Sequence, residues 1–276
     1  MKKLYFATLL FLIIAACRED HSDFVNPDIE QQSGDNRKCQ VLKAETLDGK
    51  VSGTFKYELD SIITESISVE DGEITDAWYL HIENARQFIF LRGSRDFQNA
   101  ETRIYLNGDG SIAKEIGVIL NPDGETFTEE SDQVNIFTYN SKKQLVKIDV
   151  SLEGYEKGVA NLTYDDKNRI QKIVFLDESG KEVLFYDNFT YEPHAKNDNL
   201  LPLDLFDSFS SYFIPSLRNV YLKGYRIYSP EYSFLNSNIK YTYQFRDGKL
   251  SDVSARISGF GFDEETLLKI SLNCKE

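Results

Sequence analysis

Apolar and polar residues alternate along several stretches of this chain, and the alternation predicts β-strands. Between positions 146 and 152 every second residue is aliphatic, and the residues between them are Lys, Asp and Ser. The same pattern recurs at 160–164, 253–257 and 268–274. A period of two places one face of a strand on a core and the other in water, which is typical of antiparallel sheets. The sequence therefore predicts a mainly all-β, antiparallel fold from about Cys39 onward.

Turn signals separate these stretches and indicate hairpins. The six dipeptides that end in glycine are Asp48-Gly49, Asp71-Gly72, Asp109-Gly110, Asp123-Gly124, Ser179-Gly180 and Asp247-Gly248. Glycine adopts the positive φ that tight hairpin turns require. The spacing predicts a meander of about ten to fourteen strands, as a curved or partly closed, barrel-like sheet.

A short motif repeats along the chain. Its copies are Phe137-Thr138-Tyr139, Leu162-Thr163-Tyr164, Phe189-Thr190-Tyr191 and Tyr241-Thr242-Tyr243. After the first, second and fourth copies an aliphatic residue follows a polar turn, whereas the continuation of the third is lost. Repeats at this period indicate one strand–turn–strand unit stacked on its neighbours.

Residues 193–240 interrupt the rhythm. The apolar spacing within 203–213 predicts one short amphipathic helix, because Pro202 and Pro215 bracket it. We expect this helix to pack on the concave face or at an end of the sheet.

The Tyr-centred units resemble YD-type β repeats, most clearly at Leu162-Thr163-Tyr164-Asp165 with Arg169-Ile170. Together with Asn199-Leu200-Leu201-Pro202 and the closing Tyr-rich strand, they are similar over residues 50–258 to a family of uncharacterised Bacteroidota lipoproteins. That resemblance implies a porin-like, strongly curved antiparallel sheet and carries over no catalytic residue. The chain departs from the pattern after Tyr191 and has a single Trp residue.

The first sixteen residues have the plan of a secretory signal peptide. Lys2 and Lys3 precede an apolar stretch that is too short to span a bilayer, and small residues precede Cys17. Ile14-Ala15-Ala16-Cys17 resembles the lipobox of bacterial lipoproteins, which implies lipidation of Cys17; an ordinary signal peptide with a chance cysteine is the alternative. Two or more acyl chains hold a protein on a membrane stably.

The predicted organisation is a signal peptide at 1–16, a flexible polar tether at 17–38 and a single β-rich domain at 39–276. Arg18-Glu19-Asp20 is either a surface-export tag of the kind seen in Bacteroidota lipoproteins or a solvated charge cluster. We expect a lipid-anchored protein of the outer membrane, facing the periplasm or the cell surface.

The composition narrows the partners. The net charge of −14, with 45 Asp and Glu against 31 Lys and Arg, repels phosphate backbones, so nucleic acid is disfavoured. Hydrophobic residues make up 41% of the chain, which is enough to build a core. The expected partners are the membrane, through lipid on Cys17, and an envelope protein or glycan.

Two cysteines remain after Cys17. Cys39 and Cys274 lie near the two ends of the mature chain. In an oxidising compartment such a pair can close a disulfide, worth about 5 kcal/mol at most for so long a loop. Two separate buried thiols are the alternative.

Motifs of catalysis and metal binding are missing from the sequence. Residues 107–110 resemble part of a calcium loop, but the first and twelfth ligand positions are Tyr105 and Ile116. The three histidines have no metal-ligand spacing. Asp165 and Asp166 are neighbours, which a strand would point to opposite faces, so turn residues explain them better. We expect no cofactor, no metal and no catalytic residue.

Aromatic residues are abundant, with 16 Tyr and 19 Phe. Patches such as Trp78-Tyr79 or Tyr225, Tyr228 and Tyr232 would suit sugars or a partner, although strand propensity explains them equally simply. The sequence is best interpreted as a noncatalytic envelope lipoprotein with a structural or binding role. A carrier of an apolar ligand in the concave sheet and a hydrolase with dispersed acidic residues are the alternatives.

Overall fold

The computed structural model describes most of the predicted β domain. The described residues are 14–15, 39–58, 62–94, 97–123, 126–151, 157–191, 200–201, 222–231, 233–247, 249–259 and 261–274. Apart from Ile14 and Ala15, the predicted signal peptide and tether lie outside these ranges, as does the predicted helix at 203–213.

The described chain is almost entirely β-strand, which confirms the predicted fold class. In chain order the elements are β1 (Ile14–Ala15), β2 (Cys39–Thr46), β3 (Val51–Glu58), β4 (Ile62–Glu70), β5 (Glu73–Asn84), β6 (Gln87–Ser94), β7 (Phe97–Leu106), β8 (Ile112–Leu120), β9 (Phe127–Tyr139), β10 (Leu145–Val150), β11 (Gly158–Tyr164), β12 (Ile170–Leu176), β13 (Glu182–Tyr191), β14 (Leu200–Leu201), β15 (Leu222–Tyr228), the 3-10 turn η3 (Ser233–Leu235), β16 (Ser237–Arg246), β17 (Lys249–Gly259) and β18 (Phe262–Cys274).

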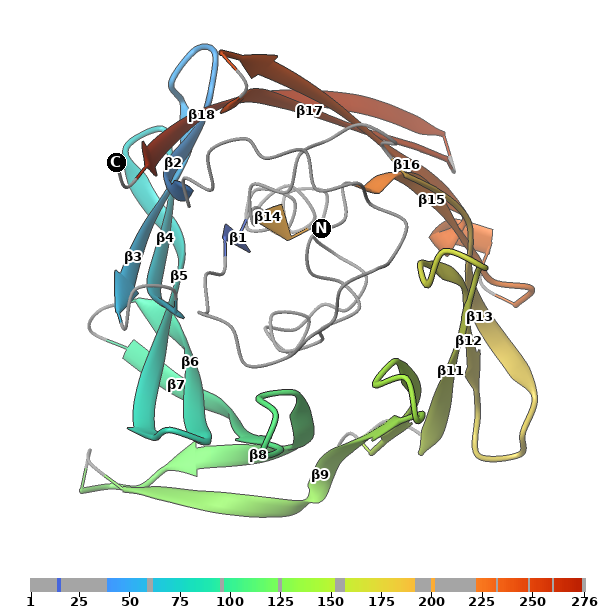
Figure 1. Ribbon diagram of the computed structural model, residues 1–276. Helices are drawn as coiled ribbons and strands as arrows, with labels where there is room; N and C mark the ends of the chain where they lie inside the picture. Colours follow the sequence, from blue (N-terminus) through green and yellow to red (C-terminus); the bar gives the residue numbers. More distant parts are fainter. Residues whose placement is uncertain are drawn as a thin grey trace.

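Sixteen of these strands form one closed antiparallel barrel, which Figure 1 shows in a view down its axis. Each strand pairs with the next along the chain, β13 pairs with β15, and the last strand β18 pairs back with β2. The short strands β1 and β14 pair with each other outside this ring order. The barrel has more strands than the ten to fourteen expected, because several strands, such as β4 and β7, lack the clean alternation on which the estimate rested.

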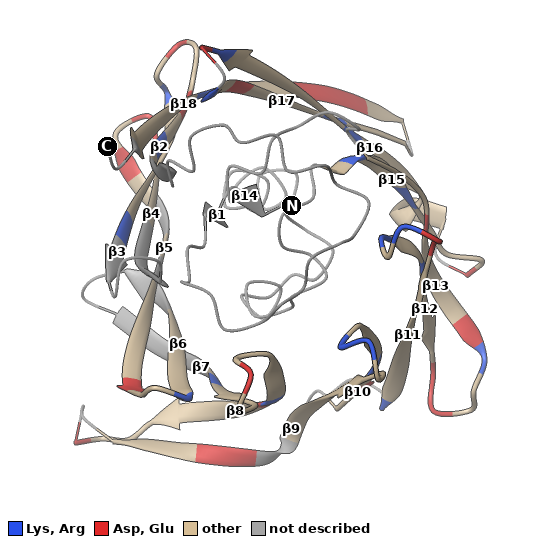
Figure 2. Cartoon of the chain, in the orientation of Figure 1, with Lys and Arg blue, Asp and Glu red and all other residues tan. Residues whose placement is uncertain are grey.

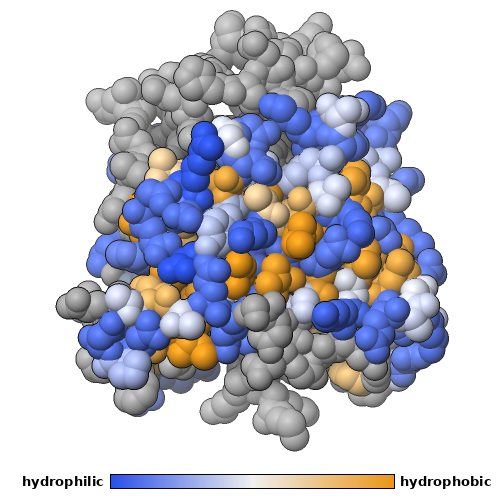
Figure 3. Space-filling model, turned by 90° about the horizontal axis from the view of Figure 1, so that it is seen from below, coloured by the Kyte–Doolittle hydropathy of each residue, from blue (hydrophilic) through white to orange (hydrophobic). Residues whose placement is uncertain are grey.

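Alternation separates the two faces of the barrel wall. We call inner face the one that carries the main core, which runs through most strands; its most deeply buried members are Ala44, Phe88, Ile104, Ile112, Leu145, Ala160, Ile170, Ile173 and Leu222. Since cross-strand partners point to the same side, Ile148 opposite Ala160 and Leu162 opposite Ile173 continue this face from strand to strand. The alternate residues form the outer face, which Figure 3 shows from the side of β8 and β9 as hydrophilic residues with hydrophobic ones between them across the middle.

Four hairpins have the same type of turn. In each, the first turn residue accepts a backbone hydrogen bond from the fourth, and its own N–H donates to the fifth; the first and fourth residues are Asn107 and Gly110, Asn140 and Lys143, Asp165 and Asn168, and Asp177 and Gly180. The fourth residue always has positive φ, between 57° and 82°. This is a type I turn followed by a left-handed residue. The expected glycine turns at 48–49, 71–72, 109–110 and 179–180 have positive φ at glycine, while Gly124 and Gly248 lie outside the described residues.

The repeated tyrosine has a structural task in three copies. The hydroxyl of Tyr164 donates to the carbonyl of Leu145 at 2.7 Å, and that of Tyr191 to Ile170 at 2.5 Å. Tyr243 donates in the same way to Leu222 at 2.7 Å. Each acceptor is the fully buried first residue of an earlier strand. The repeat that begins at Phe189, whose continuation is not evident in the sequence, therefore continues at Leu222, the first residue of β15, which pairs with Tyr191.

Candidate functional site: outer wall and closing seam

Charged residues are spread around the barrel (Figure 2), and several of them form ion pairs on the outer face. Lys147 pairs with Asp149 on β10 at 2.6 Å. Arg256 on β17 binds Asp263 on β18 at 2.7 Å, and Lys43 pairs with Glu45 on β2. Between the pairs lie exposed polar side chains, as along β16 at Asn238, Lys240, Thr242 and Gln244. The wall thus turns charge outward on widely separated strands.

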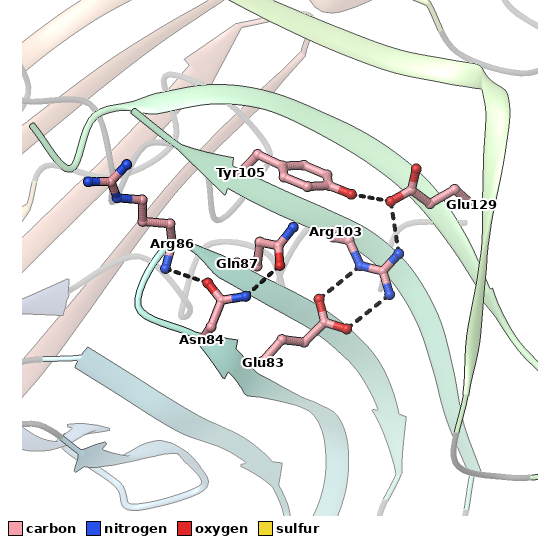
Figure 4. A network of polar contacts seen from close by, with 7 residues as sticks. All are labelled: Glu83, Asn84, Arg86, Gln87, Arg103, Tyr105 and Glu129. Carbon is pink, nitrogen blue, oxygen red and sulfur yellow. Dashed lines mark hydrogen bonds and ion pairs between the residues drawn. The ribbon is translucent and has the colours of Figure 1, made fainter. Parts of the chain in front are cut away.

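The largest outer network joins three strands (Figure 4). Arg103 on β7 donates from Nε and Nη2 to the two carboxylate oxygens of Glu83 on β5, at 2.9 and 3.0 Å. Its Nη1 donates to Glu129 on β9 at 2.8 Å. Tyr105 donates its hydroxyl to the same Glu129 oxygen, and the Lys114 ammonium lies 4.2 Å from the centre of the Tyr105 ring. Arg103 is therefore clamped between two carboxylates.

The electrostatics of this network hold its charges fixed. Hydrogen bonds from Tyr105 and Arg103 keep the pKa of Glu129 below its usual value. Burial lowers the pKa of Arg103, but the hydrogen bonds to Glu129 and Glu83 outweigh it and raise the pKa overall. Burial and then the bond to Glu129 raise the pKa of Tyr105. Because each shift moves these groups away from neutrality, they are not tuned for proton exchange near pH 7. The network acts as a clamp across the wall.

A small second core lies beside this clamp on the outer face. Ile89, Leu91 and Val118 are buried there, and Tyr79 and Phe127 pack against them. Outward residues are usually exposed to solvent, but Ile89 on β6 is 0% exposed. It is covered because Val118 on β8 and Phe127 on β9 belong to the same cluster. Both the clamp and this core were missed from the sequence, because their members come from separate strands: Arg103 is 20 residues from Glu83 and 26 from Glu129 along the chain.

The predicted aromatic patch at Tyr225, Tyr228 and Tyr232 does not form as expected. Tyr225 is buried on the inner face, where its ring stacks on Tyr186 with centroids 5.9 Å apart. Tyr228 is 40% exposed on the outer face, because its distance from Tyr225 is odd and a strand turns odd neighbours to opposite sides. Tyr232 lies outside the described residues.

The outer side of β12, β13 and β15 carries an aromatic pair with charged neighbours. The rings of Phe185 and Tyr228 are 5.9 Å apart. Lys172 lies 4.9 Å from the Phe185 ring and Arg226 lies 5.6 Å from the Tyr228 ring. Arg226 also makes a two-pronged ion pair with Asp187, at 2.8 and 2.7 Å. We call these five residues the outer aromatic pair and its charges.

The other predicted chemical features are structural. Asn107, Asp109 and Ser111 bond to one another within the turn between β7 and β8, as a hairpin explains. Asp165 accepts the backbone N–H groups of Lys167 and Arg169, so it is a turn residue, as predicted. Within the described ranges no group of three or more His, Cys, Asp or Glu side chains is placed to hold a metal ion.

The buried carboxylates of the described strands do not lie together. Glu115 is on β8 and Asp252 is on β17, eight strands away around a ring of sixteen. They therefore do not make the carboxylate pair that would support hydrolysis. His81 is exposed on β5, while His21 and His194 fall outside the described residues.

The closing seam of the barrel is the pairing of β18 with β2. The register runs from Leu268 opposite Thr46 to Cys274 opposite Cys39. The two cysteines singled out in the sequence are thus cross-strand partners at one end of the seam. Cys17, the predicted lipidation site, lies outside the described residues.

No helix in the part of the chain described here is long and apolar enough to cross a membrane. Neither a protein-family model nor a curated protein sequence matches the chain. The resemblance to YD-type repeats and to a lipoprotein family therefore stays a prediction.

Solved structures do match. One is described as a porin-like protein from Bacteroides uniformis ATCC 8492, with 13% identity and a TM-score of 0.55; the match covers 84% of this chain and 98% of that one. Another is a porin-like protein from Bacteroides vulgatus ATCC 8482, with 14% identity, a TM-score of 0.50 and the same coverage of both chains. At this identity the likeness concerns the fold alone: the chain shares the large curved antiparallel sheet of these two porin-like proteins.

Proposed function

We propose that this protein is a noncatalytic envelope lipoprotein whose barrel stands in water and is attached to the outer membrane by lipid on Cys17. The observation that carries the proposal is the sidedness of the wall. Its main apolar core faces inward, and its outer face carries ion pairs on β2, β5, β7, β9, β10, β13, β15, β17 and β18, with the small core at Ile89 and scattered exposed apolar residues between them.

This sidedness is the reverse of what a membrane-inserted barrel needs. Such a barrel has a continuous apolar band outside and a polar interior, and a single charged residue on its lipid face costs about 2–4 kcal/mol at the bilayer midplane. Here Lys240, Arg256 and Lys269 sit on the outward positions of three adjacent strands. A protein with this exterior needs a separate attachment, and a lipidated Cys17 would supply it. The Bacteroides origin and porin-like description of the two structural neighbours agree with an envelope location.

Cell fractionation of the full-length Cys17→Ser variant tests this proposal. We expect the wild type in the outer-membrane fraction and labelled by a radioactive fatty acid. The variant should lose the label and move to the soluble fraction if it is exported and folded, because its outer wall is polar. Cys39→Ser is the matched control: it removes a different cysteine and should keep both the label and the membrane location.

Two results would contradict the proposal. A variant that lacked the label yet stayed in the membrane after alkaline carbonate extraction would mean that the barrel itself is inserted. A wild type without any lipid label would mean that Cys17 is not the anchor.

The binding role that we propose rests on the outer aromatic pair and its charges. Tyr228 and Phe185 offer partly exposed aromatic surface beside the Arg226–Asp187 ion pair. A glycan has apolar C–H faces that can stack on such rings and hydroxyl groups that can bond to the flanking charges. The test is retention on immobilised envelope polysaccharide: Tyr228→Ala should lose it and Lys240→Ala should keep it. Equal retention of both variants would remove this surface from the proposal.

A further inference from the structure

The seam between β18 and β2 joins the two ends of the barrel chain. Every other neighbouring pair in the ring is connected through the chain by a turn or a longer segment, whereas β18 and β2 are the last and first strands of the ring. Their register covers Leu268 to Cys274 on one strand and Thr46 to Cys39 on the other. The ring is thus closed at this place by the strand pairing.

The register brings two of the chain's 3 cysteines opposite each other. Residues directly opposite in an antiparallel pair have Cβ atoms about 4.5–5.5 Å apart, on the same side of the sheet. A disulfide needs Cα atoms about 4.4–6.8 Å apart, and antiparallel partners are about 4.5–5.5 Å apart at Cα. A disulfide also needs Cβ atoms about 3.5–4.5 Å apart, so a bridge between Cys39 and Cys274 requires the two strand ends to approach by about 1 Å.

We propose that Cys39 and Cys274 form a disulfide that closes the barrel covalently at its seam. The two thiols lose two protons and two electrons and form one S–S bond. The electrons pass by thiol–disulfide exchange to a disulfide-bearing oxidant of the cell envelope, which is reduced to a dithiol. The inference relies on the proposed export for the presence of this oxidant.

The position of the bridge gives it a mechanical consequence. Cys39 is the first residue of β2 and directly follows the predicted tether from Cys17. Any pull through a membrane anchor therefore reaches the barrel at Cys39, the end from which β2 would peel away from β18. A bond to Cys274 passes this force to the last strand, so that the strands cannot separate one hydrogen bond at a time.

The first measurement is the thiol state of the full-length protein. Cells are denatured in an alkylating reagent without reductant, and the intact mass and the peptide containing residue 39 are determined. We expect Cys39 and Cys274 unalkylated and joined in one cross-linked pair. The same protein, purified in detergent and reduced, is then exposed to oxidised glutathione, where it should reform the intramolecular bridge.

The two arms separate this inference from the proposed function. A bridge in cells supports both the pairing and export. A protein that is reduced in cells but closes with oxidised glutathione supports the pairing and contradicts export. If both thiols are alkylated in cells and again after oxidised glutathione, the pairing is overturned.

A shifted cysteine provides the matched control. In the double variant Asn273→Cys, Cys274→Ser the thiol moves by one residue, which turns it to the opposite face of β18. This variant should fail to form the intramolecular bridge under the conditions that close the wild type. Reductant should lower the Tm of the wild type by about 5–10 °C and leave that of the shifted variant unchanged. Equal bridging of the two chains would contradict the register argument.

Discussion

The inner and outer faces of this barrel are built from alternate residues of the same strands, yet they serve different ends. On β17 the inward Val253 and Ala255 are buried, whereas the outward Arg256 is exposed and ion-paired. The inner face holds the fold together through apolar burial. The exposed ion pairs of the outer face contribute little to stability, since such pairs are worth about 0–1 kcal/mol each, although the small core around Ile89 buries apolar surface there. We therefore expect the largest losses of stability from changes at buried inward positions and the smallest from changes at exposed outward positions.

The largest effect is expected on the inner face. Phe88→Ala removes a ring that is 2% exposed in the main core. It should lower the free energy of unfolding by about 3–5 kcal/mol, because it removes buried apolar surface and leaves a cavity. Urea unfolding followed by circular dichroism measures it. A loss below 1 kcal/mol would mean that the inner face is not the stabilising one.

A smaller loss is expected for the repeated tyrosine. Tyr191→Phe deletes the hydroxyl that donates to the Ile170 carbonyl, which should cost about 0.5–1.5 kcal/mol. On the outer face Tyr228→Phe should change stability by less than about 0.5 kcal/mol. If chemical unfolding gave the same loss of free energy for Tyr191→Phe and Tyr228→Phe, the hydrogen bond from the repeated tyrosine would contribute nothing to stability.

The same tyrosine predicts an alkaline limit. Burial, and then the nearby Asp165 charge, raise the pKa of Tyr191 above its ordinary value of 10.0. Because the folded state holds this proton more tightly than the unfolded chain, the contribution is complete below pH 10 and is lost as the pH rises through the folded pKa. The free energy of unfolding, measured from pH 9 to 12, should fall more steeply for the wild type than for Tyr191→Phe. Parallel curves for the two proteins would refute this.

The outer clamp gives an intermediate case. Arg103→Ala leaves Glu83 and Glu129 without their shared cation, and should cost about 1 kcal/mol after allowance for solvent screening. Arg103→Lys should recover only part of this, since an ammonium does not match the fork geometry. Thermal unfolding at low and high salt measures the difference, and a loss that does not shrink with salt would argue against an electrostatic role.

The fall in the free energy of unfolding at acidic pH tests the same clamp. The pKa of Glu129 is lowered by its bonds from Tyr105 and Arg103, so its contribution is present above its unfolded pKa near 4.5 and is lost as the pH falls through the folded value. Glu129→Gln should flatten the stability curve below pH 5. An unchanged fall at acidic pH would mean that Glu129 is unpaired in solution.

The smallest effect is expected for Lys240→Ala on the outer face of β16. Lys240 is exposed, and its removal should change the free energy of unfolding by less than about 0.5 kcal/mol and leave the cell fraction unchanged. Chemical unfolding and fractionation check both. A large loss would show that the outer polar surface is part of what holds the strands in place.

Some of the candidate site could be predicted locally, and some could not. The alternation in the sequence predicted that Arg256 lies on the opposite face of its strand from Val253 and Ala255, because the backbone of a strand fixes a period of two. The clamp around Arg103 was missed, because its partners come from β5 and β9 and no local pattern announces them. The aromatic patch was misjudged because Tyr225 and Tyr228 were grouped by closeness in sequence without regard to their opposite parity.

The sequence by itself determined the antiparallel β class, the strands with clean alternation, most of the turns and the two faces of those strands, since these follow from residues within a few positions of one another. It also marked the repeated tyrosines, though not their task. Only the tertiary structure decided that β18 pairs with β2, that the ring has sixteen strands, and that Cys39 lies opposite Cys274. Pairing between the first and last strands depends on the summed curvature and stagger of all the strands between them. No short stretch of the chain records that sum.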